Sequence, residues 1–424
     1  MNRSLVVPPV SVPPEESLDA LTTLLRAAME GNGPAVLVEP PAPGVTGTSA
    51  QAHVSDESAP LPSVPDGVAV VVGTSGSTGA PRRVMLTAAA LRASADATAE
   101  RLGGPGAWLL ALPTTHVAGL QVVLRALLAD APVVPLADGP FRPQAFVDAV
   151  AAMPADRRRY ASLVPTQLHR LLAEPAGTPL GDAARDALRH LDAILVGGAA
   201  LAPDLAQRAA DAGAAVVRTY GMSETCGGCV YDGVPLRGVR VRTDPEGRIL
   251  LSGRVLAAGY LDDPEADAEA FVDIHGGRWL RTHDLGSLEL SDDTMTLTLT
   301  VEGRADDVIV TGGEKVAAPA VAAALGGWHG LGEVAVVGVP DPEWGQAVVV
   351  VATLDPGAHA PTLDDVREHV RAQLGAPAAP RALRLVEALP LRGPGKPDRA
   401  TLAEVAAQAM EQATEDGLPP AQAD

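Results

Sequence analysis

The sequence predicts an α/β protein with a large N-terminal domain, a small β-barrel-like subdomain within it, and a small mobile α+β domain at the C-terminus. Between residues 67 and 215, short aliphatic runs alternate with helical segments, which is typical of parallel-type sheets covered by helices. After residue 230 the segments are shorter, alternate in polarity and are separated by turns, which indicates antiparallel strands. A second αβ pattern then fills about one hundred residues, enough for a separate domain.

The N-terminal segments are a helix around Ser17–Glu30, a strand at Ala35–Glu39 and a loop over residues 40–66, rich in Pro, Ser, Gly and Asp. The strands expected next are Val68–Val72, Trp108–Leu112, Pro132–Leu136, Ala161–Val164, Ala193–Val196 and Ala214–Arg218. The helices expected between them are Ala88–Arg101, Gly119–Ala129, Arg142–Met153, Pro165–Ala173 and Pro203–Ala212.

The later segments follow the same logic. Residues 238–243, 248–252, 287–291 and 295–301 are the expected strands of the barrel-like subdomain. The C-terminal domain is expected to contain strands Val308–Thr311, Glu333–Val339, Gln346–Leu354 and Ala382–Glu387, with helices Pro319–Leu325, Leu363–Leu374 and Ala400–Ala413. Thr362 and Asp365 predict a capping box. The predicted domains are residues 1–303 and 304–410, with a tail over 411–424.

Composition narrows the function. A chain of 424 residues is too long for one compact core. Its formal charge of −20 disfavours nucleic acid and anionic membranes as partners, and 3% aromatic residues leave few rings for stacking single strands. No apolar stretch is long enough for a signal peptide or a membrane span, so we expect a cytoplasmic protein. Oligomeric state is left open.

Two residue types stand out by their number. Of 32 basic residues only Lys315 and Lys396 are lysines, so these positions either need a compact ammonium or kept lysine by chance. Cys226 and Cys229 are the only cysteines, in a C-G-G-C segment that cannot supply four zinc ligands. They are either a redox pair or two small buried thiols.

The segment VVVGTSGSTGAPRR, residues 70–83, predicts a polyphosphate loop. An aliphatic strand enters a run of glycine and hydroxyl residues, with a helix expected soon afterwards. Main-chain N–H groups and neutral hydroxyls can hold phosphates on an acidic protein, whereas the Walker spacing is absent. A flexible connector would have the same composition, but the place between strand and helix favours binding. The loop residues are Thr74, Ser75, Gly76, Ser77, Thr78 and Gly79.

The segment RTYGMSETCGG, residues 218–228, follows another aliphatic run. Glu224 offers a hard oxygen ligand to a Mg²⁺ ion that bridges phosphates, and Tyr220, one of four tyrosines, could cover a purine. The alternative is a solvated glutamate on a turn.

Four weaker segments complete the pattern. LVGGAAL, residues 195–201, is a strand opening into two glycines. In RTHDLG, residues 281–286, Asp284 stands between an expected strand end and a glycine. It could accept two ribose hydroxyls, although a lone Asp before such a turn is more often a cap. Residues 301–316 contain Arg304 and Asp306 where the predicted domains meet. PLRGPGKPDR, residues 390–399, places Lys396 in a Pro/Gly loop, where the scarcity of lysine favours function over solvated surface.

These six segments, in this order and across nearly the whole chain, resemble the adenylate-forming superfamily of acyl-CoA ligases, carrier-protein adenylation domains and luciferases. More narrowly, residues 113–128, 162–172 and 217–236 are similar to o-succinylbenzoate–CoA ligases of menaquinone biosynthesis.

The resemblance implies an enzyme that uses ATP, Mg²⁺ and CoA. A carboxylic acid attacks the α-phosphate of ATP, which gives an acyl-adenylate and pyrophosphate, and the thiol of CoA then displaces AMP. A fixed ammonium and Mg²⁺ would stabilise the charge on the α-phosphate.

The resemblance also implies roles for individual residues. Lys396 matches the adenylation lysine, Glu224 the Mg²⁺ ligand and residues 74–79 the phosphate loop. His116 matches a position lining the acyl pocket. Asp306 matches the hinge of the small domain, and the turn Gly312, Gly313, Glu314, Lys315 would face the site during thioester formation. The positions matching nucleotide contacts are Gly198, Ala199, Ala200, Tyr220, Gly221, Met222 and Ser223, with Asp284 and Arg304 at the ribose.

The chain departs from the family pattern at three places. Arg82 and Arg83 stand where the family usually has lysine after the loop proline, which keeps the charge. His283 replaces the glycine before the ribose-binding aspartate, and the chain is shorter than typical members. A second substrate carboxylate would need donors, for which the candidates are His116, Thr114, Thr115 and Ser162.

Two alternatives share the same motifs. A free-standing adenylating enzyme would load a carrier protein instead of CoA, but no carrier domain is fused here. A non-catalytic nucleotide-binding relative could afford to lose Lys396 and Glu224, and this chain keeps both.

Overall fold

A seven-stranded sheet forms the largest layer of the protein. In the computed structural model, which describes residues 2–6, 14–39, 62–74, 82–137, 139–291, 296–355, 357–390 and 398–415, five of its strands are parallel. They are, in spatial order, β8 (Val133–Pro135), β7 (Gly106–Leu110), β9 (Arg158–Leu163), β10 (Ala193–Val196) and β11 (Val216–Met222). The antiparallel strands β12 (Gly227–Tyr231) and β13 (Val234–Pro235) complete it.

Helices connect these parallel strands, as a parallel sheet requires. They are α3 (Val117–Leu128), α4 (Pro143–Ala152), α5 (Pro165–Ala173), α6 (Pro179–Arg189) and α7 (Pro203–Asp211). Four of them begin with proline, whose fixed φ suits the first helical turn and whose missing N–H is not needed there.

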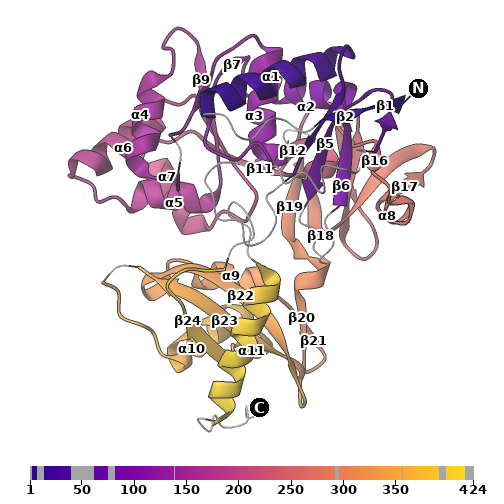
Figure 1. The fold of residues 1–424 in the computed structure, drawn as a ribbon. Helices are drawn as coiled ribbons and strands as arrows, with labels where there is room; N and C mark the ends of the chain where they lie inside the picture. The colour runs from indigo at the N-terminus through magenta and orange to yellow at the C-terminus, as the bar shows by residue number, and fades with distance from the viewer. Residues whose placement is uncertain are drawn as a thin grey trace.

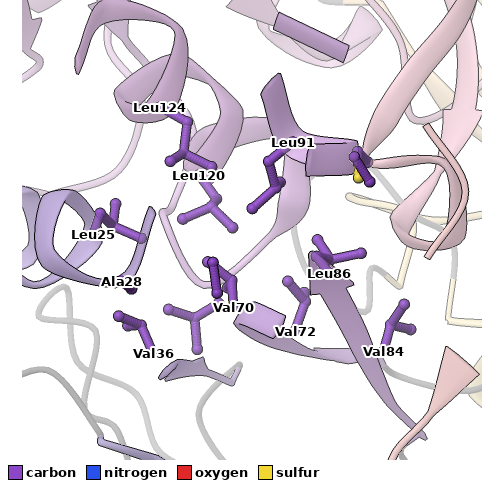
Figure 2. Close-up of a cluster of buried hydrophobic side chains, with 14 of the residues drawn as sticks. Leu25, Ala28, Val36, Val70, Val72, Val84, Leu86, Leu91, Leu120 and Leu124 are labelled. Atoms are coloured by element: carbon purple, nitrogen blue, oxygen red, sulfur yellow. The ribbon is translucent and has the colours of Figure 1, made fainter. Parts of the chain in front are cut away.

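A five-stranded sheet packs beside it with the order β16, β6, β5, β3, β2. Its strands are β2 (Leu5–Val6), β3 (Ala35–Val38), β5 (Val68–Thr74), β6 (Arg82–Thr87) and β16 (Gly259–Tyr260). Figure 2 shows aliphatic side chains of this sheet, such as Val70 and Leu86, facing Leu25 of α1 (Pro14–Glu30), Leu91 of α2 (Ala88–Arg101) and Leu120 of α3. This apolar core fixes β5 and β6 against the three helices.

The barrel-like segment is an antiparallel sheet. Its strands are β14 (Val239–Thr243), β15 (Arg248–Gly253), β17 (Phe271–Ile274), β18 (Gly277–Ser291) and β19 (Thr296–Arg304), with helix α8 (Pro264–Ala270) beside it. Strands β1 (Asn2–Arg3) and β4 (Val64–Pro65) form a separate small pair. Figure 1 shows β18 and β19 extending toward the C-terminal part of the chain.

A third α/β unit follows the short helix η2 (Ala305–Asp307). Its sheet contains β20 (Val308–Thr311), β21 (Glu314–Ala317), β22 (Leu331–Asp341), β23 (Gly345–Leu354) and β24 (Ala382–Leu385). Helices α9 (Ala318–Leu325), α10 (Leu363–Leu374) and α11 (Arg399–Glu415) pack against it (Figure 1). The predicted capping box is present: Thr362 Oγ1 accepts from the Asp365 N–H at 3.2 Å, and the Thr362 N–H donates to Asp365 Oδ2 at 2.9 Å.

The predicted fold class is confirmed, with several corrections. Glu314 and Lys315, expected as part of a turn, belong to strand β21. The two expected strands near 287–301 are the longer β18 and β19. Helix α6 was not predicted. Strand β6 was also missed, and it stands between the glycine-rich segment and helix α2. The expectation that this segment lies directly between a strand and a helix is therefore wrong, because it connects two antiparallel strands.

No helix among the described residues is long and apolar enough to cross a membrane.

Candidate active site

The parallel topology brings three predicted segments to one edge of the seven-stranded sheet. Strands β9, β10 and β11 are neighbours and run the same way, so the residues that follow them lie together at their carboxyl ends. Gly197 and Gly198 follow β10, and β11 ends in Tyr220, Gly221 and Met222. The residues predicted to surround the adenine are thereby gathered, with Ala199 and Ala200 exposed after Gly198 and Ser223 beginning the next turn.

Two glycines of this edge are required by close packing. A Cβ at Gly197 would lie 2.3 Å from Thr219 Oγ1, and one at Gly221 would lie 2.1 Å from the Gly227 carbonyl oxygen. Both distances are far below van der Waals contact, so no side chain fits at either position. Gly198 has φ of +85°, which turns the chain away from β10.

Tyr220 and Asp284 meet across two sheets. The Tyr220 hydroxyl donates to Asp284 Oδ2 at 2.7 Å, and Arg304 Nη1 lies 3.7 Å from Asp284 Oδ1. Asp284 and Arg304 are direct register partners on β18 and β19. Burial, and then the negative charge of Asp284, raise the pKa of Tyr220 well above its ordinary value. The predicted purine neighbour and the predicted ribose acceptor are therefore one hydrogen-bonded unit, and the phenol stays protonated.

Glu224 lies on the short helix η1 (Ser223–Thr225), directly after β11. The Tyr260 hydroxyl donates to Glu224 Oε1 at 2.8 Å, and the Ala257 N–H donates to the Glu224 carbonyl oxygen at 2.8 Å. Burial and the nearby Glu224 carboxylate raise the pKa of Tyr260 above its ordinary value, so this hydroxyl also stays a donor. The prediction missed Tyr260. The small number of tyrosines, four in the chain, was the signal that could have drawn attention to it.

The two arginines after the glycine-rich segment have different partners. Arg83 forms a two-pronged ion pair with Glu39, with Nε to Oε1 at 2.6 Å and Nη2 to Oε2 at 3.4 Å. Arg82 stacks on Tyr260, with its Cζ 5.4 Å from the ring centroid, and its Nε lies 3.8 Å from Asp263 Oδ2. Of the two arginines, Arg82 therefore contacts the site residue Tyr260, whereas Arg83 is paired with Glu39.

Helix α3 packs its first turns against the Glu224 turn. A Cβ at Gly227 would lie 3.5 Å from Gln121 Cγ and 3.9 Å from Val117 Cγ2, and His116 is the N-cap residue of this helix. His116 and Thr114 are half-buried, whereas Thr115 and Ser162 are buried. Their role toward a substrate stays a prediction.

Several predicted residues are not tested by this geometry. Of the glycine-rich segment, the structure describes Thr74, whose hydroxyl donates to the Arg82 carbonyl oxygen at 3.1 Å. Ser75, Gly76, Ser77, Thr78, Gly79 and Lys396 lie outside the described residues. Asp306 falls within η2.

The predicted thioester-step turn is a tight hairpin between β20 and β21. Gly312 and Gly313 have φ of +59° and +83°, and Lys315 follows on β21 as an exposed residue. Figure 1 shows this hairpin extending away from the N-terminal part of the protein. The hairpin that carries Lys315 is therefore directed away from the N-terminal part of the protein in this arrangement.

Cys226 and Cys229 are both free and fully buried in apolar clusters. Burial raises the pKa of the Cys229 thiol to about 12 and that of Cys226 still further. Burial and the raised pKa keep both thiols protonated, which favours two small buried thiols over a redox pair.

Comparison with known proteins decides the family. A model of the AMP-binding enzyme family matches residues 18–261, and a model of its C-terminal domain matches residues 320–396. The chain belongs to the AMP-binding enzyme family. Tyr220 and Glu224 lie within the larger matched region, and Asp284 lies between the two matched regions.

Individual relatives of this AMP-binding enzyme differ in the acids they are named for. A probable 2-succinylbenzoate–CoA ligase of Mycobacterium tuberculosis is 47% identical over 340 residues, covering 80% of this chain and 85% of that protein. A sulfoacetate–CoA ligase of Cupriavidus necator is 33% identical over 413 residues, covering 89% of this chain and 75% of that protein.

The fold is shared with a solved o-succinylbenzoate CoA synthetase of Bacillus subtilis, in complex with its acyl-adenylate intermediate. That structure has a TM-score of 0.67 and 23% identity, covering 90% of this chain and 80% of the other. Another structure of the same enzyme, with ATP and a magnesium ion, has a TM-score of 0.66 and 22% identity, covering 90% and 81%.

Proposed function

We propose that this AMP-binding enzyme is an ATP-dependent acid–CoA ligase whose acid is 2-succinylbenzoate, acting in the cytoplasm in menaquinone biosynthesis. The observation that carries the proposal is the 47% identity to the mycobacterial ligase over 80% of the chain. That identity is combined with two hydrogen bonds between segments distant in sequence, from Tyr220 to Asp284 and from Tyr260 to Glu224.

The first half-reaction is the attack of a carboxylate oxygen on the α-phosphorus of ATP. The bond from phosphorus to the pyrophosphate oxygen breaks, and acyl-adenylate and pyrophosphate form. In this proposal Asp284 accepts the ribose hydroxyls, which is supported by the contacts of its carboxylate with Tyr220 and Arg304. Residues 74–79 supply main-chain and hydroxyl donors for the phosphates, and Lys396 supplies the ammonium for the α-phosphate.

Glu224 suits a magnesium ion held mainly by phosphates. Mg²⁺ in nucleotide sites takes one or two carboxylates and keeps other positions for water and phosphate oxygens. Among the described residues no group of three or more His, Cys, Asp or Glu side chains is arranged to bind a metal. In this proposal Glu224 is the carboxylate ligand and the phosphates supply the other oxygens. A bound Mg²⁺ would offset the negative charge of the triphosphate.

The second half-reaction is the attack of the CoA thiolate sulfur on the acyl carbon. The bond from that carbon to the phosphate oxygen breaks, the thioester forms, and AMP leaves. We propose that residues 304–410 turn about Asp306 between the two steps, which would remove Lys396 and bring Lys315 to the site. The outward β20–β21 hairpin of the present arrangement supports the need for such a rotation.

The test supplies ATP, Mg²⁺ and 2-succinylbenzoate, first without and then with CoA, and measures pyrophosphate release and the thioester by mass spectrometry. We expect pyrophosphate in both cases and 2-succinylbenzoyl-CoA only with CoA. Sulfoacetate serves as the comparison acid. A higher kcat/KM for sulfoacetate would contradict the assigned acid, and adenylate formation without thioester would favour a carrier protein as the acceptor.

A further inference from the structure

Tyr260 makes a contact with the site that neither the motifs nor the family assignment explains. It lies on the two-residue strand β16, far from Glu224 in the chain, and only 5% of it is exposed. Its hydroxyl donates to Glu224 Oε1 at 2.8 Å. No other hydrogen bond or ion pair of the Glu224 carboxylate occurs among the described residues, so Tyr260 engages one oxygen and leaves Oε2 for a ligand.

The donor is held in place by its own backbone. The Tyr260 N–H donates to Asp267 Oδ1 at 2.6 Å, and β16 pairs with β6 through Gly259 and Tyr260. Gly259 has φ of +152°, and a Cβ there would lie 2.5 Å from Asp267 Oδ2. Glycine is therefore required before Tyr260 for this aspartate to reach the Tyr260 amide.

The acceptor is held equally firmly. The Ala257 N–H donates to the Glu224 carbonyl oxygen at 2.8 Å, which ties the η1 turn to the segment before β16. Two residues later, the Cys226 carbonyl oxygen accepts from Gln121 Nε2 at 2.5 Å and from Ser94 Oγ at 3.2 Å. Because both backbones are held by other hydrogen bonds, the hydroxyl–carboxylate bond sets the direction of the Glu224 side chain.

A third contact joins this pair to the strand that follows the glycine-rich segment. Arg82 opens β6, and its guanidinium stacks on the Tyr260 ring at 5.4 Å while its Nε lies 3.8 Å from Asp263 Oδ2. A cation over the ring face is attracted by the negative charge density there. The Tyr260 ring is thus packed between Glu224 and the first arginine after the segment predicted to bind phosphates.

We infer that Tyr260 is a positioning residue for the Mg²⁺ site: its hydroxyl orients the Glu224 carboxylate so that the second oxygen meets the ion held on the triphosphate. This inference rests on the proposed function for the presence of Mg²⁺ and ATP. A hydrogen bond from a fixed outer partner selects one orientation of a metal-binding carboxylate before the ion arrives, which lowers the ordering cost of binding.

The test measures ATP binding by calorimetry over a series of Mg²⁺ concentrations, with neither acid nor CoA present. Tyr260→Phe removes only the hydroxyl. We expect the Mg²⁺ concentration for half-maximal ATP affinity to rise about tenfold or more, since loss of such outer partners typically costs about 10–100-fold in metal affinity. At saturating Mg²⁺ the variant should recover the wild-type ATP affinity.

Tyr231→Phe is the matched control. Tyr231 is fully buried, and its hydroxyl contacts Thr98 Oγ1 at 3.1 Å and Arg125 Nη2 at 3.3 Å, with no contact to Glu224. This variant loses the same atom from a buried, hydrogen-bonded phenol, so it measures the general cost of the substitution. We expect its Mg²⁺ dependence to equal that of the wild-type enzyme.

A double-mutant cycle with Glu224→Gln tests whether Tyr260 acts through Glu224. In the Glu224→Gln background, Tyr260→Phe should cause no further change in Mg²⁺ dependence. An equal loss of ATP affinity at every Mg²⁺ concentration, or an unchanged Mg²⁺ dependence in Tyr260→Phe, overturns the inference. Failure of the wild-type protein to bind ATP with Mg²⁺ would instead overturn the proposed function.

Discussion

The Asp284→Asn variant tests the nucleotide site most directly. Asparagine keeps the shape and one acceptor oxygen but removes the charge that holds Tyr220 at 2.7 Å and Arg304 at 3.7 Å. The Asp284 side chain is only 15% exposed, so water replaces these contacts poorly. Hydrogen bonds to charged groups contribute about 1.5–3 kcal/mol each, against about 1 kcal/mol for neutral ones. We therefore expect the free energy of unfolding to fall by about 1–2 kcal/mol.

Nucleotide affinity should fall for the same reason. A carboxylate that accepts ribose hydroxyls makes charge-assisted bonds roughly twice as strong as those of an amide. We expect ATP to bind about tenfold more weakly, which corresponds to about 1.4 kcal/mol. The assay is calorimetric titration at saturating Mg²⁺ with ATP and with 2′-deoxy-ATP. The wild-type enzyme should prefer ATP, and Asp284→Asn should lose most of that preference.

The control is Asp232→Asn. Asp232 is also a carboxylate bonded to arginine, with Oδ2 accepting from Arg101 Nη2 at 3.0 Å and Oδ1 accepting from the Arg218 N–H at 2.9 Å. It bonds to Arg218 of β11, and among the described residues no hydrogen bond or ion pair joins it to Tyr220 or Asp284, so nucleotide affinity should not change. If Asp284→Asn still prefers ATP over 2′-deoxy-ATP by the wild-type factor, Asp284 is not the ribose acceptor.

The remaining predictions concern the C-terminal part of the chain. Lys396→Ala should abolish pyrophosphate release yet spare thioester formation from supplied acyl-adenylate, and equal loss of both would contradict the domain rotation. Lys315→Ala should slow the second step more than the first in the same paired assays. Burial of the Asp341 carboxyl opposes its ionisation. This effect is outweighed by hydrogen bonds from the backbone N–H groups of Trp344 and Glu343 and by the Arg381 guanidinium, so the pKa of the carboxyl is lowered. Its stabilising effect is present above the unfolded pKa of about 4 and is lost as the pH falls through the lower native pKa. As the pH falls below about 4, the free energy of unfolding measured in urea should therefore decrease more steeply for the wild-type protein than for Asp341→Asn. Parallel pH profiles of the two proteins would contradict the assignment.

The element pattern was predictable wherever local periodicity decided the structure. Helices Ala88–Arg101, Pro165–Ala173 and Leu363–Leu374 and strands Ala193–Val196 and Val308–Thr311 have the bounds expected from sequence. Strand β6 was not predictable in the same way. Its two arginines, Arg82 and Arg83, look like solvated loop residues. They belong to a strand because β5 pairs with them, and β16 pairs with the next two residues of β6 from the other side.

The candidate site also has features that could be predicted from sequence and features that could not. Sequence by itself determined which residue types were available: Glu224 and Asp284 as acceptors, Tyr220 as a ring beside the nucleotide, and two lysines among many arginines. The motifs were readable because each is a short run of adjacent residues whose chemistry does not depend on distant neighbours. Pattern and spacing placed Glu224 directly after a strand, as the structure has it, whereas Asp284, expected between a strand end and a glycine, lies in the middle of β18.

Only the tertiary structure decided which of these groups touch. Three contacts join residues that are tens of positions apart in the chain: Tyr220 with Asp284, Tyr260 with Glu224, and Arg83 with Glu39. Such pairs are set by sheet order and strand register, which arise from burying apolar faces of many segments at once. A hydrogen bond depends on distances of a few tenths of an ångström, and no local pattern carries that information across separate sheets.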